Sequence, residues 1–230
     1  MEHLGCRDLS EGGKNKQILD PWGKKVRDGQ FGFESAAGGF IRILPCLGDS
    51  RVLAKVKGQL LQRTTQALRV LVVSLDLDAD DSSSREQSFR DRILEADPDA
   101  KSNSPRRMTL ADGTPVHLAL WEARSDVAVL PAKQTLERLV CSAIHAAYPT
   151  RAPHVGDWLA RRPPDSSPPE LTPPMEAKAH AWSHVAGWYA DRGLDEFYQR
   201  LWNDDSIAQA LRGELQNSGA WSVAESIACR

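Results

Sequence analysis

Apolar positions in the first part of the chain follow strand spacing and helix spacing in turn. Residues 40–46 (FIRILPC) are a short apolar run, and residues 48–68 carry leucine and valine at helical spacing. Residues 69–75 (RVLVVSL) are a β-branched run that is apolar on both faces, which is typical of a central strand of a parallel sheet. Strand, helix and strand within about 35 residues predict a βαβ unit with a right-handed crossover.

Further periodic segments follow this unit. A helix is expected to begin near Ser83, because Glu86 occupies the capping-box position three residues later. Residues 108–123 predict two strands around a turn at Asp112–Gly113. Residues 131–148 predict a helix. The apolar positions of this last helix predict a buried stripe of Leu136, Leu139, Val140, Ala143 and Ile144.

These segments predict the fold class and the domain organisation. Residues 1–150 are expected to form an α/β domain with a central, mainly parallel sheet flanked by helices, as in Rossmann-like folds. Its first part, residues 1–38, lacks clear periodicity and is expected to be irregular. Residues 151–175 predict a Pro-rich linker, since seven of the 14 prolines lie between Pro153 and Pro174.

A helical C-terminal extension is expected over residues 176–230. Helices are predicted at about 176–192, 194–202 and 205–217, with Gly219 close to the end of the last one. Large aromatic side chains usually anchor such a segment on an apolar surface. The residues expected to pack the extension on the α/β domain are Trp182, Trp188, Trp202 and Trp221.

Carboxylates gather directly after the 69–75 run, at Asp76, Asp78, Asp80 and Asp81. Residues two apart on a strand point the same way, about 6.6 Å apart along the chain, so Asp76 and Asp78 face one point. Two such carboxylates repel each other unless a cation lies between them. Mg²⁺ or Mn²⁺ is the expected cation, with Asp80 as a third ligand. The alternative is an acidic exposed turn that helps to cap the next helix.

The strand ending in VVSLDLDADD, between a strand–helix pair and a further helix, resembles the Toprim domain. That domain occurs in topoisomerases, DnaG-type primases, OLD-family nucleases and small stand-alone families tied to phage defence. Two later segments, LPAKQTLERLV and EAKAHAWSHVAGWYADRG, look like helices of the small stand-alone Toprim proteins. The resemblance covers about residues 35–205 in layout, and only the DxD strand is a sharp motif.

The resemblance implies a divalent-metal-dependent enzyme that processes nucleic acid, of the phosphodiesterase or nuclease type. Asp76 and Asp78 would hold the metal ion, and a glutamate at the end of the first strand would act as general acid or base. The family context for that glutamate is hydrophobic–Glu–Gly, and the candidates here are Glu11 in DLSEGGK and Glu34 in FGFESAAGG. Glu137 would be an auxiliary acid. The residues before Glu11 make a poor strand, so the alternative is a catalytically degenerate binding subunit of a larger complex.

Basic residues are the candidates for contacts with nucleic acid. The net charge is −2, so the whole chain carries no field that attracts nucleic acid, and only local groups qualify. The candidates are Lys24, Lys25, Arg106 and Arg107. The alternative for each of them is an ordinary solvated surface position.

Other kinds of site are weaker alternatives. His180 and His184 share a helix face, but no glutamate lies between them and no third zinc ligand is evident. A nucleotide-sugar transferase also uses DxD at a strand end, yet only 75 residues precede the motif here. A haloacid-dehalogenase-like phosphatase requires Thr or Val and then Gly after DxD, and DADDS differs from that pattern.

Cysteine spacing and hydropathy bear on the cellular compartment. The four cysteines contain no CxxC pair, which argues against a zinc ribbon and a disulfide framework. Cys46 and Cys141 lie in apolar surroundings and are expected to be buried thiols. No apolar run approaches the roughly 18 residues of a membrane span, and no leader peptide is visible. A cytoplasmic protein without a membrane partner is therefore expected.

Overall fold

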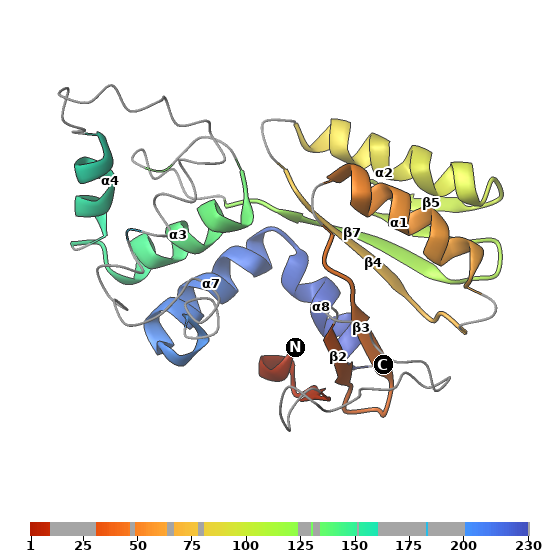
Figure 1. The fold of residues 1–230 in the computed structure, drawn as a ribbon, viewed down its shortest axis with the longest axis horizontal. Helices are drawn as coiled ribbons and strands as arrows, with labels where there is room; N and C mark the ends of the chain where they lie inside the picture. Colours follow the sequence, from red (N-terminus) through yellow and green to blue (C-terminus); the bar gives the residue numbers. More distant parts are fainter. Residues whose placement is uncertain are drawn as a thin grey trace. The chain divides into compact units, whose positions relative to one another are not determined.

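A computed structural model gives the fold in two compact units (Figure 1). The first unit comprises Met1–Leu75, Ser83–Ala119 and Trp221–Arg230, and the second comprises Asp76–Ser82 and Leu120–Ala220. The structure describes residues 1–9, 31–46, 49–63, 67–77, 81–123, 130, 134–150, 152–160, 183 and 201–229.

A three-stranded antiparallel sheet lies in the first unit, after the 3₁₀ turn η1 (Glu2–Leu4). Its strands are β1 (Arg7–Asp8), β2 (Phe31–Glu34) and β3 (Phe40–Ile43), in the order β1-β2-β3. Gly38 makes the turn between β2 and β3 with φ of 79°, a value that glycine adopts without strain. Part of the range 1–38 that was expected to be irregular is therefore in strands.

A four-stranded sheet follows in the order β4-β7-β6-β5. Its strands are β4 (Leu71–Asp76), β5 (Lys101–Ser104), β6 (Arg107–Thr109) and β7 (Pro115–Trp121). The pairs β5–β6 and β6–β7 are antiparallel. Gly113 has φ of 88° between β6 and β7, which confirms the predicted turn at Asp112–Gly113.

The contacts between β4 and β7 advance in the same direction along both strands. Hydrogen bonds join Thr114 Oγ1 to Leu68 O at 3.3 Å, Ser74 Oγ to Ala119 O at 3.4 Å and Leu77 N to Trp121 O at 3.4 Å. The order of these contacts is that of a parallel pair. The arrows of β4 and β7 point the same way in Figure 1. The sheet is thus mixed, with one parallel pair and two antiparallel pairs.

The prediction of a central, mainly parallel sheet is wrong. β3 belongs to the antiparallel sheet, so β3, α1 (Asp49–Leu61) and β4 do not form a βαβ unit. β4 lies at the end of its sheet order rather than at the centre. Its burial pattern gives the reason, because only Val73 and Leu75 are buried and the other β4 residues are half-buried. A β-branched run therefore serves here as a partly covered edge strand.

Helices α1 and α2 (Ser82–Ala96) lie along the same side of the four-stranded sheet (Figure 1). Phe89 and Ile93 of α2 are 1% and 0% exposed. They share the first unit with other buried apolar side chains. These are Val56 and Leu60 of α1, Val73 and Leu75 of β4, Met108 of β6, and Val116 and Leu118 of β7.

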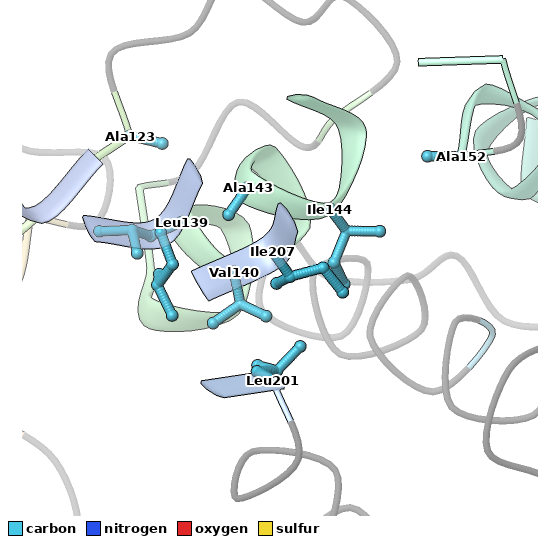
Figure 2. Close-up of a cluster of buried hydrophobic side chains, with 9 residues drawn as sticks. Ala123, Leu139, Val140, Ala143, Ile144, Ala152, Leu201 and Ile207 are labelled. Atoms are coloured by element: carbon cyan, nitrogen blue, oxygen red, sulfur yellow. The ribbon is translucent and has the colours of Figure 1, made fainter. Parts of the chain in front are cut away.

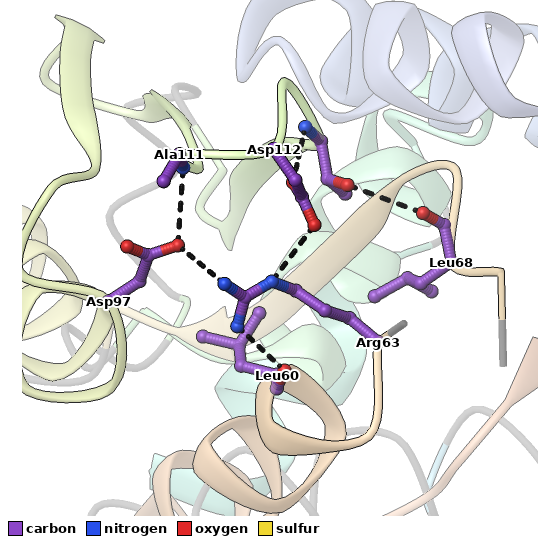
Figure 3. A network of polar contacts seen from close by, with 7 residues as sticks. Leu60, Arg63, Leu68, Asp97, Ala111 and Asp112 are labelled. Atoms are coloured by element: carbon purple, nitrogen blue, oxygen red, sulfur yellow. Dashed lines mark hydrogen bonds and ion pairs between the residues drawn. The ribbon is translucent and has the colours of Figure 1, made fainter. Parts of the chain in front are cut away.

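Arg63, just after α1, joins three parts of the first unit (Figure 3). Its guanidinium donates to Asp97 and to Asp112, each at 3.0 Å, and to Leu60 O at 2.9 Å. Asp97 is 5% exposed and also accepts from Ala111 N at 3.2 Å. The end of α1, the end of α2 and the β6–β7 turn are therefore held by one planar cation.

Helices form the second unit around one apolar cluster (Figure 2). Those within the described residues are α3 (Leu136–Ala147), α4 (Pro153–Ala160), η2 (Leu201–Asn203) and α7 (Asp205–Asn217). The cluster consists of Ala123, Leu139, Val140, Ala143, Ile144, Ala152, Leu201, Ile207 and Leu211. Four of the five residues in the predicted α3 stripe are thus confirmed as core. Leu136, at the first turn of α3, is 37% exposed.

Polar contacts also tie α3 to the later helices of the second unit. Ser142 Oγ donates to a Glu214 carboxylate oxygen at 2.6 Å, and both residues are buried. Tyr148 donates to Asp204, the N-cap of α7, at 2.5 Å. Trp202 packs against the apolar cluster, as predicted for this tryptophan.

The C-terminal half agrees with several predictions. α7 has the predicted bounds, and Gly219 follows it with φ of 80°. A last helix, α8 (Ala220–Ala228), was not predicted. α4 occupies the first part of the expected linker, while the proline-dense stretch 161–174 lies outside the described residues.

Predictions for residues 176–200 also fall outside the described residues, Ser183 excepted, and include Trp182 and Trp188. Among the helices that the structure describes, none combines the length and apolarity needed to cross a bilayer.

Candidate functional site

Asp76 is the last residue of β4, and it contacts the start of helix α3. Its Oδ1 accepts a hydrogen bond from Leu136 N at 2.9 Å. Leu136 is the first residue of α3, where backbone N–H groups have no partner within the helix. The helix dipole favours negative charge at this end. Part of the charge at the strand end is therefore balanced by the protein itself.

The start of α3 is fixed by its own capping residue. Thr135 adopts an extended backbone, and its hydroxyl accepts from Arg138 N at 3.2 Å. The Thr135 carbonyl accepts from Leu139 N at 3.0 Å. Asp76 and Thr135 thus supply acceptors for the N–H groups of Leu136 and Arg138 at the start of α3.

Two further acids of the second unit lie on neighbouring elements, one in α3 and one directly after β7. Glu137 is next to Leu136 in the first turn of α3 and is half-buried. Glu122 follows Trp121 at the end of β7, and Trp121 O accepts from Leu77 N at 3.4 Å. Glu122 was not predicted. The sequence feature that could have identified Glu122 is its position directly after β7. That position indicates a site residue only when β7 is known to be the parallel neighbour of β4.

These acids do not form a closed metal centre by themselves. Within the described ranges, no three acidic, histidine or cysteine side chains are grouped so that they could hold a metal ion. Asp76 is the described member of the predicted metal ligands, while Asp78 and Asp80 lie outside the described residues. A carboxylate has about four acceptor positions, and the bond from Leu136 N occupies one of those of Asp76.

Arg138 is a buried cation beside this edge, with 7% of its surface exposed. Its guanidinium donates to Ala123 O and to Gln134 Oε1, each at 3.2 Å. Gln134 Oε1 also accepts from Ala123 N at 2.9 Å. The residues after β7 are thereby joined to those before α3. Arg138 was not predicted, because the LERL segment was interpreted as a helix pattern with Glu137 as its candidate functional residue.

Glu34 lies in the three-stranded sheet of the first unit. It is the cross-strand neighbour of Arg7, and the two form an ion pair. The side chains are 40% exposed for Glu34 and 69% exposed for Arg7, so this is a surface pair. Glu34 and Asp76 belong to different units. Glu11, the other candidate for the family glutamate, is not among the described residues.

The predicted nucleic-acid contacts differ in their surroundings. Arg106 donates to Glu86 at 2.7 Å, and only 27% and 14% of the two side chains are exposed. Glu86, proposed for a capping box, is thus a partner of Arg106. Arg107 is exposed on β6. Lys24 and Lys25 are outside the part of the chain that the structure describes.

Cys141 and His145, both in α3, are buried. Cys141 is fully buried, and desolvation, with the nearby Glu137 charge, raises its pKa to about 12. Cys46 is half-buried, so burial is confirmed for Cys141 only. Desolvation lowers the pKa of His145 in α3. His180 and His184 lie in a range that is not described.

Comparison with protein-family models, with curated proteins and with solved structures finds no match to this chain. The resemblance to Toprim proteins therefore rests on the residues quoted above.

Proposed function

We propose that the chain is a Toprim-like protein that processes nucleic acid with a divalent cation at the carboxyl edge of β4. Asp76, Asp78 and Asp80 would hold Mg²⁺ or Mn²⁺, since hard cations prefer carboxylate oxygens. The small stand-alone families that the chain resembles extend this proposal to a role in phage defence.

The observation that carries the proposal is the position of Asp76. It lies at the carboxyl end of β4, beside the parallel strand β7, and at the start of α3. Ligands of α/β sheets bind outside the carboxyl ends of parallel strands. Helix N-termini favour phosphate groups for the same electrostatic reason that favours Asp76 there. A cation and a phosphodiester would both be accommodated at such an edge.

Each residue has a definite part in the proposal. The bound cation would polarise a phosphoryl oxygen and lower the pKa of a bound water. Leu136 N orients the Asp76 carboxylate through its 2.9 Å hydrogen bond. Glu137 would place a second carboxylate in the first turn of α3. Glu11 or Glu34 would be the general acid or base, and Glu34 already pairs with Arg7.

A cleavage assay tests the proposal. Labelled single-stranded and double-stranded DNA and RNA are incubated with the protein in Mg²⁺, Mn²⁺ or EDTA. Cleavage should need the cation and should fall by about a hundredfold or more in Asp76→Ala and Asp78→Ala, because metal catalysis supplies several kcal/mol.

Asp157→Asn is the matched control, since Asp157 is an exposed acid of α4 in the same unit. This variant should retain the activity of the original chain. Cleavage that survives EDTA, or that is unchanged in Asp76→Ala, would refute the proposed metal-dependent enzyme.

A second function is a binding subunit without catalysis. It is favoured by the hydrogen bond from Leu136 N, which gives Asp76 a structural use that requires no metal ion. The ion pair between Glu34 and Arg7 favours the same alternative. This alternative predicts nucleic-acid binding without cleavage under every cation tested.

A further inference from the structure

The edge of the four-stranded sheet at β5 and β6 is an exposed polar surface. All four residues of β5 are exposed. Lys101 lies opposite Thr109, and Ser104 lies opposite Arg107. Met108, between the two β6 residues, is 1% exposed and therefore points to the other side of the sheet. We call Lys101, Asn103, Ser104, Arg107 and Thr109 the hairpin surface.

Hydrogen bonding arranges the polar groups of the hairpin surface. Thr109 Oγ1 donates to Asn103 Oδ1 at 2.7 Å, which fixes the Asn103 amide with its oxygen toward β6. The Asn103 amide nitrogen carries two N–H donors. His117, the neighbour of Arg107 on β7, is only half exposed, so the surface is confined to β5 and β6.

The charge of the hairpin differs in sign from that of the chain. Residues 101–109 (KSNSPRRMT) contain three cations and no acid, whereas the net charge of the chain is −2. Glu86 offsets Arg106. The side chains of Lys101 and Arg107 are exposed and form neither an ion pair nor a hydrogen bond with any described residue. Asp99, in the turn before β5, is the nearest acid in sequence.

We infer that the hairpin surface binds the phosphate backbone of a nucleic acid. Two uncompensated cations beside amide and hydroxyl donors match phosphate oxygens. A peptide strand added to β5 is the less favoured partner, because the β5–β6 register shifts between Ser102 and Ser104 and irregular edges resist strand addition. The choice of nucleic acid as the partner rests on the proposed function. The inference places the binding of that partner on the hairpin surface, where binding requires no metal ion.

The test is the salt dependence of binding, measured by fluorescence anisotropy of labelled oligonucleotides in EDTA. Lys101→Gln combined with Arg107→Gln should weaken binding roughly tenfold at low salt. The slope of log K against log[salt] should shrink by about 1.4 on single strands or about 1.8 on duplex, as expected for two lost phosphate contacts.

Arg51→Gln combined with Lys55→Gln is the matched control, because it removes two exposed cations from α1 in the same unit. This control should retain the original slope, and thermal melts check that both double variants are folded. Equal losses in the two double variants, an unchanged slope in the hairpin variant, or no binding by the original chain would each overturn the inference.

Asp76→Asn separates this inference from the proposed function. In EDTA, Asp76→Asn should bind the oligonucleotide as the original chain does, whether or not the edge of β4 binds a metal ion. Loss of cleavage with retained binding would therefore agree with both proposals, whereas loss of oligonucleotide binding by Asp76→Asn in EDTA would overturn the hairpin assignment.

Discussion

At the residue scale, Asp76 combines charge with a hydrogen bond, and two substitutions separate the two roles. Asp76→Asn retains an oxygen that accepts from Leu136 N, and Asp76→Ala removes it. We expect Asp76→Ala to lower the free energy of unfolding by about 1 kcal/mol, as for the loss of a helix-capping acceptor, and Asp76→Asn to lower it by less. Urea unfolding of both variants measures the difference. Equal stability of Asp76→Ala and the original chain would show that the bond contributes nothing.

His145 gives the second prediction at this scale. Burial lowers its pKa below the ordinary 6.5, so the unfolded chain binds more protons in the range just below that value. The free energy of unfolding should therefore fall as the pH is lowered from about 6.5, and His145 should have no effect above that range. His145→Gln should show a shallower fall in denaturant unfolding measured between pH 5 and pH 8. An identical pH profile in the variant would contradict this assignment.

The candidate site could be predicted from sequence only in part at this scale. Asp76 was found because its position in DLDADD follows an apolar run. Its contact with Leu136 could not be found, because the two residues are 60 positions apart and only the fold brings them together. Glu122 was missed for the same reason.

At the scale of elements, local signals predicted the helices α3 and α7 and the β6–β7 turn. Each of these depends on neighbouring residues, such as the stripe of α3 and the glycine with positive φ at residue 113. Strand pairing depends on residues far apart in the chain. The run at 69–75 was compatible with a central strand and with the edge strand β4, and only the pairing with β7 decides between them.

Arg63 offers the test of how elements of the first unit are joined. Arg63→Ala leaves the buried Asp97 with its Ala111 bond but without its cation, and should cost about 2 kcal/mol of unfolding free energy. Arg92→Ala is the control. It removes a more exposed arginine that pairs with Glu95 within α2, so it should cost less than about 1 kcal/mol. Equal costs in thermal or urea unfolding would contradict the joining role of Arg63.

At the scale of the whole molecule, the two units do not follow the linear order of the chain. The first unit takes up three separate segments, including Trp221–Arg230, and the second takes up two. The predicted boundaries at residues 150 and 176 came from composition, which changes along the chain but does not record long-range contacts. Composition indicated the proline-rich range, whereas the contacts that define the two units join residues far apart in the chain.

Titration with Mn²⁺ by isothermal calorimetry tests the central claim most directly. The original chain and Asp157→Asn should bind the ion, and Asp76→Asn and Asp78→Asn should bind it on the order of tenfold more weakly or worse, because ligand charge sets the affinity of such sites. Asp76→Asn retains the acceptor for Leu136 N, so its loss of binding would report on the carboxylate charge rather than on the fold. Equal Mn²⁺ affinity in Asp76→Asn and the original chain, or no binding by either, would contradict a metal site at the edge of β4.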